Sequence, residues 1–288
     1  FTASRWARQQ DLPVSTVHHH HAHASAAYVE ALLDDADLDD MLVFTWDGVG
    51  LGPDDTLWGG EALLGKPGQW GRAGSFRPFK LPGGERAGRE PWRSAAALCW
   101  ESGQQCTLAE ATDPLLFSFW QQGRNAPITS AVGRLFDAAA ALTGVCTRAS
   151  FEGQGPMLFE ALAAGFPNID DVPVTRLEIA CKDGVCLADW ATLIPVLVDD
   201  SIPEAERAAR FHVSMADTLL RLALRLREQT GVNTIGLAGG VFQNRVLTEQ
   251  AISLLDTAGF KTTMPLLMPV NDASISFGQI ADYGYNKG

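Results

Sequence analysis

A run of histidines near the start of the chain has the residue type and spacing of a metal site. Five of the six histidines in the 288-residue sequence lie within His18–His23. Residues four apart lie on one face of a helix, about 6 Å apart along its axis, so His19 and His23 can direct two imidazoles at one metal ion. The helical metalloprotease motif has Glu directly after its first histidine, where this chain has His20. Zinc protease chemistry is therefore not expected.

Two other interpretations of the histidine run are an engineered tag and a solvated, polar helix start. A tag is normally terminal and longer, whereas Ala22-His23-Ala24-Ser25 continues directly into a helical pattern. The spacing therefore favours a metal site over both alternatives.

Two imidazoles do not complete a metal site, and two aspartates are candidates for the remaining ligands. Asp47 ends an expected buried strand at a glycine turn, and Asp272 follows another expected strand. The alternatives are an Asx-turn residue for Asp47 and a helix N-cap for Asp272. Mixed histidine and carboxylate ligation suits zinc or ferrous iron and does not separate them.

Two further groups of residues are candidates for ligand binding. A strand that ends in Gly239-Gly240 and opens a helix presents unpaired backbone N–H groups to an anion, although a tight turn is the alternative. Asn244 is one turn into that helix and can reach a ribose or phosphate. Asp137, in the run that begins at Gly133, can bind a ribose hydroxyl, but its residue type alone favours a surface carboxylate.

The elements that must position these residues alternate between helices and strands. We expect helices over residues 17–33, 128–142, 156–164, 202–229 and 242–256 and after Asp272. We expect strands over residues 41–46, 56–58, 174–180, 233–237 and 261–267 and from Val185, with Asp183-Gly184 as a hairpin turn. The Gly-, Pro-, Arg- and Trp-rich stretch Lys66–Arg93 is expected to be an ordered surface insertion. An α/β fold follows, with ligand loops at the carboxyl ends of strands.

Composition limits the partners and the compartment. The formal net charge of −12 disfavours nucleic acid, and no apolar run approaches the roughly 20 residues of a membrane span. The five cysteines are scattered, which predicts reduced thiols, with Cys181 and Cys186 as packed thiols beside the hairpin turn. The chain is therefore expected to be soluble and cytoplasmic.

Six motifs, in order along the chain, resemble the C-terminal domain of the HypF family, the carbamoyltransferases of nickel-iron hydrogenase maturation. They are His19-His20-His21-Ala22-His23, Trp46-Asp47-Gly48-Val49-Gly50, Leu57-Trp58-Gly59-Gly60-Glu61, Leu81-Pro82-Gly83-Gly84, Glu152-Gly153-Gln154 and Gly239-Gly240-Val241-Phe242-Gln243-Asn244. The resemblance implies a two-lobed, actin-like ATPase fold with RNase H-like lobes. Residues 1–127 would form a first lobe without its opening hairpin and helix. Residues 128–288 would form a nucleotide-binding lobe whose last helix returns toward the first.

The resemblance also assigns roles to individual residues. It implies metal ligands at His19, His23, Asp47 and Asp272, and substrate contacts at Asp47, Gly48 and Gly50. It implies nucleotide contacts at Asp137, Gly153, Gln154, Gly239, Gly240 and Asn244.

The implied enzyme is a metal- and ATP-dependent carbamoyltransferase with iron or zinc as a Lewis acid. It transfers the carbamoyl group of carbamoyl adenylate to the C-terminal cysteine thiolate of a HypE-like acceptor, toward the cyanide ligand of the hydrogenase. An adjacent adenylate-forming domain, absent from this chain, supplies the adenylate. One alternative is an O-carbamoyltransferase acting on a small-molecule hydroxyl, with Lys66–Arg93 as the segment that would specify the acceptor. The other is a non-enzymatic metal-binding protein.

Overall fold

The computed structural model describes the backbone of residues 2–285 and, except at residues 2, 3 and 170, their side chains. The strands are β1 Met41–Leu51, β2 Leu57–Gly65, β3 Gly71–Phe76, β4 Phe79–Lys80, β5 Ile128–Thr129, β6 Glu178–Lys182, β7 Val185–Asp189, β8 Thr234–Ala238 and β9 Lys261–Thr263. The α-helices are α1 Thr2–Ala7, α2 His19–Ala31, α3 Trp92–Ser102, α4 Pro114–Gln121, α5 Val132–Leu142, α6 Gln154–Ala164, α7 Leu193–Leu197, α8 Glu204–Thr230, α9 Arg245–Thr257 and α10 Ile275–Tyr285. None of the described helices is long and apolar enough to cross a membrane.

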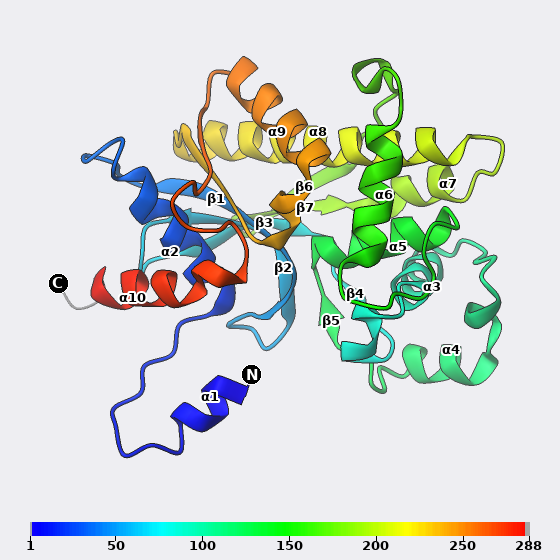
Figure 1. Cartoon of the computed structure of the whole chain (residues 1–288), viewed down its shortest axis with the longest axis horizontal. Coiled ribbons are helices and arrows are strands. Elements are labelled where there is room, and N and C mark those ends of the chain that lie inside the picture. The colour runs from blue at the N-terminus through cyan, green and yellow to red at the C-terminus, as the bar shows by residue number, and fades with distance from the viewer. Residues whose placement is uncertain (1, 286–288) are drawn as a thin grey trace.

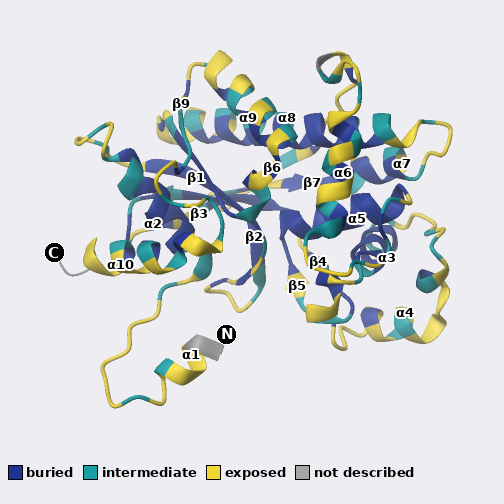
Figure 2. Cartoon of the chain, viewed as in Figure 1, coloured by how far each residue is buried: buried dark blue, intermediate teal, exposed yellow. Residues whose placement is uncertain are grey.

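One mixed sheet forms the centre of the molecule, with strand order β6-β7-β3-β2-β1-β8-β9 (Figure 1). Strand β5 also pairs with β2, and β4 pairs with β5. Strand β1 pairs antiparallel with β2 and parallel with β8. Its side chains alternate between two hydrophobic cores, because successive residues of a strand point to opposite faces. Phe44 and Trp46 pack with residues of α5 and α8, whereas Met41 and Val43 pack with residues of α2. The sheet is thus covered on both faces, as the dark central strands of Figure 2 show.

The predicted α/β order of elements is largely confirmed, but the helix expected over residues 128–142 begins at Val132, and Ile128–Thr129 form the strand β5. The expected helix over residues 242–256 is divided into a 3-10 turn, Gly240–Gln243, and α9. The division falls at Asn244, whose side chain accepts the backbone N–H of Leu247 and so caps α9. The strand expected over residues 261–267 ends at Thr263. The division into lobes at residues 127 and 128 stays a prediction.

The expectation that Lys66–Arg93 forms a surface insertion is wrong. This stretch supplies β3, which lies inside the sheet between β2 and β7. The small residues at the start of β3 hid its strand character, but Phe76 at its end is fully buried and Trp70 before it is nearly so. The Gly-, Pro-, Arg- and Trp-rich composition therefore misled the assignment, because small residues also allow elements to pack closely in a core.

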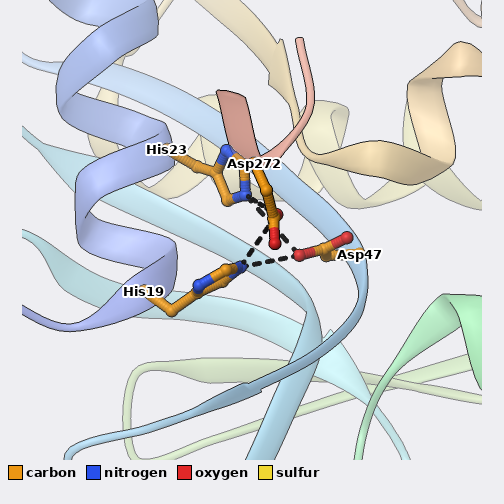
Figure 3. Close-up of side chains that lie close together, drawn as sticks. All are labelled: His19, His23, Asp47 and Asp272. Carbon is orange, nitrogen blue, oxygen red and sulfur yellow. Dashed lines mark hydrogen bonds and ion pairs between the residues drawn. The ribbon is translucent and has the colours of Figure 1, made fainter. Parts of the chain in front are cut away.

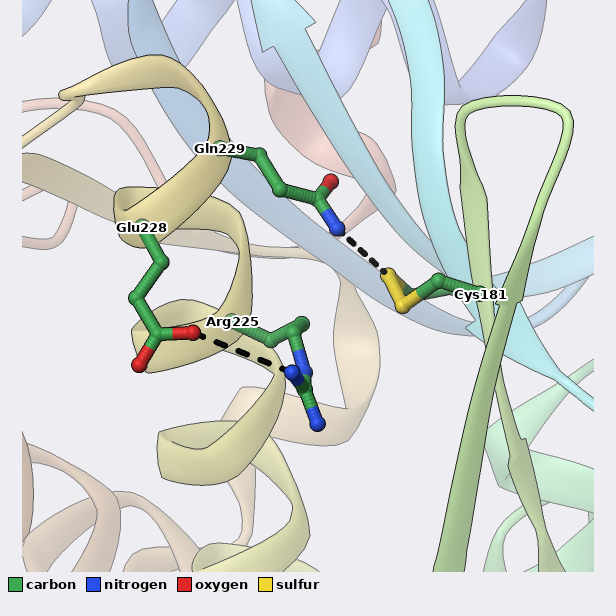
Figure 4. The surroundings of a disulfide bond; sticks show 5 residues. Cys181, Arg225, Glu228 and Gln229 are labelled. Carbon is green, nitrogen blue, oxygen red and sulfur yellow. Dashed lines mark hydrogen bonds and ion pairs between the residues drawn. A yellow bond between two sulfur atoms is a disulfide. The ribbon is translucent and has the colours of Figure 1, made fainter.

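The expectation of packed thiols at Cys181 and Cys186 is also wrong, because their sulfur atoms are bonded in a disulfide. The predicted Asp183-Gly184 turn is present with positive φ at both residues, and it pairs the two cysteines directly across the β6–β7 hairpin. Gln229 of α8 approaches this disulfide, with its Nε2 3.9 Å from Cys186 Sγ (Figure 4). The other three cysteines are free thiols.

The last helix, α10, packs closely against α2 (Figure 1). A Cβ atom on Gly278 would lie only 1.9 Å from the carbonyl oxygen of Ala22, so the contact requires glycine. The buried carboxylate of Asp282 accepts the Ser25 hydroxyl at 2.9 Å and the Gly68 N–H at 3.0 Å. These contacts fix the end of the chain against the helix that carries the histidines.

Candidate active site

Four side chains from distant parts of the sequence meet at one point, which we call the tetrad: His19, His23, Asp47 and Asp272 (Figure 3). His19 Nε2 donates to Asp47 Oδ2 at 2.8 Å and lies 3.4 Å from Asp272 Oδ1. His23 Nε2 lies 3.3 Å from Asp272 Oδ1 and 3.5 Å from Asp47 Oδ2. One donor atom from each residue lies within 4.8 Å of all the others. The convergence expected for a metal site is therefore present.

Local structure explains why these side chains point at one another. Helix α2 places the His19 and His23 rings on one face, with centroids 4.9 Å apart. Asp47 lies where the pairing of β1 with β2 becomes irregular, between Trp46 and Gly50. A Cβ atom on Gly50 would lie 2.7 Å from the His19 ring, so this glycine makes room for the imidazole.

Asp272 is not the N-cap that was its alternative interpretation. The neighbouring Asn271 has that role, because its side chain accepts the Ala273 N–H at 3.1 Å. The loop before it is held by Glu30, whose carboxylate accepts the backbone N–H groups of Leu266, Leu267 and Met268. Asp272 is thus free of a capping role and is directed at the histidines.

The tetrad is strongly coupled electrostatically. Burial alone would lower the pKa of His19, but its contacts with Asp272 and Asp47 raise it to about 9. The same two contacts raise the pKa of His23 against the effect of burial. The contacts with His19 and His23 lower the pKa of Asp272 to about 2, and hold that of Asp47 well below its usual range despite burial. The two carboxylates therefore favour the protonated form of both imidazoles.

The residues present fit a divalent metal ion. His23 is fully buried, yet its ring nitrogens make no hydrogen bond of good geometry. Buried polar atoms without such partners are unusual in folded proteins, and an ion between the four donors would provide one. Two imidazole nitrogens with two carboxylate oxygens suit zinc or ferrous iron. His20 is also fully buried but lies outside the tetrad, beside Trp58.

We expect zinc affinity to rise with pH, because zinc must displace the proton that the carboxylates hold on His19. With the pKa of His19 at about 9, affinity should increase roughly tenfold per pH unit for each proton released, from neutral pH up to about pH 9. Competition titrations against a chromogenic chelator at several pH values, corrected for chelator protonation, measure this slope. A flat profile between pH 6.5 and 8.5 would contradict the proposed ligand chemistry.

The tetrad lies at the edge of a cavity of about 660 Å³. Six of the residues predicted for the site line this cavity, namely Asp47, Gly48, Gly153, Gly240, Asn244 and Asp272. The cavity therefore joins the candidate metal ligands to the glycine turn that was expected to bind an anion.

The remaining predicted substrate and nucleotide contacts do not line the cavity. Gly239 has φ +101° and a Cβ there would lie 2.2 Å from the Trp46 carbonyl oxygen, so the tight-turn interpretation holds for this residue. Gln154 turns back on Ser150, whose N–H and hydroxyl it accepts. Gly50 makes space for His19, as described above.

Asp137 is not the surface carboxylate that its residue type suggested, since it is only 1% exposed. Burial raises the pKa of Asp137 to about 6, although the Arg134 guanidinium at 3.2 Å opposes this shift. Asp137 lies on α5, which lines the cavity through Gly133, Arg134 and Phe136, but Asp137 does not line it. The predicted contact between Asp137 and a ribose hydroxyl therefore requires a ligand that extends beyond the residues lining the cavity.

Asn244 is oriented by a hydrogen-bond chain. His212 Nδ1 donates to the Ala208 carbonyl at 2.7 Å, so its Nε2 accepts from Asn244 Nδ2 at 2.9 Å. Burial lowers the pKa of His212 to about 4, which keeps the ring neutral. The amide nitrogen of Asn244 is therefore bonded to His212, and its amide oxygen caps α9. These two hydrogen bonds fix the side chain at the cavity wall.

Sequence reasoning assigned no role to several polar residues that line the cavity, among them Arg134, Glu152, Glu160, Gln243 and Asn271. A signal existed for Arg134, which precedes Asp137 by three residues and so shares its helix face. No comparable spacing pointed to Glu160 or Gln243, because the cavity forms only when α6 and the glycine turn meet.

Comparisons with known proteins identify the family. The family model described as "Carbamoyltransferase, Kae1-like Domain, second subdomain" matches residues 43–279. The chain is 32% identical to carbamoyltransferase HypF of Synechocystis over 305 residues, covering 97% of this chain and 38% of that protein. It is 34% identical to a carbamoyltransferase HypF homolog of Cupriavidus necator, covering 96% of this chain and 72% of that protein.

A solved structure supports the same relationship. The crystal structure of full-length HypF in its phosphate- and nucleotide-bound form matches with a TM-score of 0.88 and 28% identity, covering 99% of this chain and 38% of that one. This likeness confirms the predicted α/β fold of the actin-like, RNase H-like class. The chain therefore belongs to the HypF family of carbamoyltransferases, and its residues 43–279 form the second subdomain of that family's Kae1-like domain.

Proposed function

We propose that this chain transfers a carbamoyl group from carbamoyl adenylate to the C-terminal cysteine thiolate of a HypE-like acceptor, in cyanide-ligand synthesis for nickel-iron hydrogenase. The observation that carries the proposal is the shared cavity. The tetrad borders it through Asp47 and Asp272, and Gly240 and Asn244 line it. A carbamoyltransferase that uses an adenylate needs one site for the metal and one for the nucleotide, and both candidate sites border this cavity.

The proposed reaction needs no nucleophile from the chain. The acceptor thiolate attacks the carbamoyl carbon, the C–S bond forms, and the C–O bond to phosphate breaks as AMP leaves with the electron pair. A zinc or ferrous ion held by His19, His23, Asp47 and Asp272 would supply Lewis-acid chemistry. The adenylate would come from an adenylate-forming domain outside this chain.

The chain's own residues orient the substrate in this proposal. Gly240 N–H donates to Asp47 Oδ1 at 3.3 Å, which ties the glycine turn directly to the tetrad. Gly133 packs against the loop Asp47–Gly50, which carries the proposed substrate contacts, since a Cβ on Gly133 would lie 2.7 Å from Gly48 Cα. Because the loop has no room to shift toward α5, the position of Gly48 relative to Asp47 is set before substrate binds.

Calorimetry of AMP binding, with and without zinc, tests the proposal. We expect AMP to bind, zinc to strengthen that binding, and Asn244→Ala to weaken it at least roughly tenfold, because its amide is positioned at the cavity wall. Asn168→Ala is the matched control, since Asn168 is exposed and caps no helix through its side chain. Thermal melts must show that Asn244→Ala folds.

Zinc binding without AMP binding by the folded wild-type chain would contradict the transferase proposal. That outcome would favour the non-enzymatic metal-binding alternative.

A further inference from the structure

Arg134 is the one Lys or Arg side chain among the described residues that line the cavity. Four carboxylates line it as well, those of Asp47, Glu152, Glu160 and Asp272. A cavity of this composition repels a phosphate group unless a cation is placed to receive it. Arg134 is only 5% exposed, so it is held in the wall by the protein.

The guanidinium of Arg134 has N–H groups that are not fully hydrogen-bonded. Its Nη1 lies 3.2 Å from Asp137 Oδ2, and its Nη2 lies 3.5 Å from Glu152 Oε1. Its Nε is buried and has no hydrogen-bond partner. Asp137 is buried and fixed, whereas the Glu152 side chain is 65% exposed and can turn outward into solvent. An incoming anion can therefore take the place of Glu152 at little cost.

Two glycines lie against the guanidinium, where a larger residue would crowd it. A Cβ on Gly48 would lie 3.5 Å from Arg134 Nη2, and a Cβ on Gly88 would lie 3.1 Å from its Nη1. Gly48 directly follows Asp47 of the tetrad. Arg134 thus lies between the buried Asp137 and the loop that leads to the candidate metal ligands.

We propose that Arg134 binds the phosphoryl group of the adenylate and of the departing AMP, by exchanging its contact with Glu152 for phosphate oxygens. This inference rests on the proposed function. Arginine suits the role because its planar fork matches two phosphate oxygens at once. AMP carries more negative charge at its phosphate than the adenylate does, so Arg134 stabilises the leaving group more than the bound substrate.

Binding of AMP and of adenosine, measured by calorimetry on the zinc-loaded chain, tests the inference. For Arg134→Gln we expect adenosine affinity within about twofold of wild type and AMP affinity lowered by about 10- to 100-fold. For Glu152→Gln we expect AMP affinity raised severalfold, because a competitor for the guanidinium is removed. That gain should vanish in the Arg134→Gln, Glu152→Gln double variant.

The outcomes separate the possible failures. An unchanged ratio of AMP to adenosine affinity in Arg134→Gln overturns the assignment of Arg134 alone. Equal losses for both ligands, with a lowered Tm, also overturn it, because Arg134 would then only support the fold. If Arg134→Gln does not fold, the absence of any AMP gain in Glu152→Gln overturns it instead. A folded wild-type chain that binds neither ligand overturns the proposed function as well.

Discussion

Replacing His23 with alanine should lower the zinc affinity of this chain by at least roughly 100-fold, because His23 is a proposed ligand, and changes to residues that only support ligands already cost about 10- to 100-fold. His23 is fully buried on α2, and its Nε2 lies within 3.5 Å of both tetrad carboxylates. His20 does not take its place, since the His20 ring lies beside Trp58. Competition titration against a chromogenic zinc chelator measures the loss.

His21→Ala is the matched control for this experiment. His21 is on the same helix but outside the tetrad, where its ring contacts His18 and Trp58. The zinc affinity of the His21→Ala variant should stay within about twofold of wild type, because the substitution leaves all four proposed donors in place. Equal zinc affinities in the two variants would show that the tetrad is not the zinc site.

The second large effect concerns stability. Glu61→Ala should lower the free energy of unfolding by about 3–5 kcal/mol, the usual cost of removing one partner from a buried ion pair. Glu61 is completely buried, with Oε1 2.9 Å from Arg72 Nη2. Its other oxygen accepts the backbone N–H groups of Gly59 and Gly60 at 2.6 and 2.8 Å. The hydroxyls of Ser75 and Ser130 also donate to Glu61, so the substitution leaves five donors without this acceptor.

The Glu61 variant should also disturb the tetrad. A Cβ at Gly59 would lie 2.7 Å from the Asp47 carbonyl oxygen, so the backbone held by Glu61 is in close contact with Asp47. Urea denaturation measures stability, and the zinc titration above measures the effect on Asp47. Glu178→Ala, an exposed change on edge strand β6, should alter stability by less than about 0.5 kcal/mol. A Glu61 variant as stable as this control would show that the buried network contributes little.

The sequence predicted the site best where local geometry alone determines contact. The spacing of His19 and His23 is sufficient because a helix turns by a fixed angle per residue. The sequence pattern made Asp47 and Asp272 candidate ligands, but each had an alternative role as a turn or cap residue. The family resemblance decided between these interpretations. Only the approach of α10 to α2 brings Asp272 to the histidines, and that approach depends on distant contacts.

The wrong predictions share a physical cause. Whether Asp137 is buried depends on what packs over α5, and the composition of its own helix does not contain that information. The disulfide requires that Cys181 and Cys186 face each other across the hairpin, which is a matter of register. The strand β3 was missed because glycine-rich segments suit both loops and closely packed sheet interiors.

The tetrad joins α2, near the start of the described chain, to the turn before α10, near its end. A bound ion would therefore act as a cross-link between α2 and the turn before α10. Strands β1 and β8 already pair, so the ion would close only the loop formed by the segments between α2 and β1 and between β8 and Asp272. The entropy of closing such a loop is modest. The cross-link acts chiefly on local opening, so release of the ion would let α2 and α10 fray as one unit while the sheet stays folded.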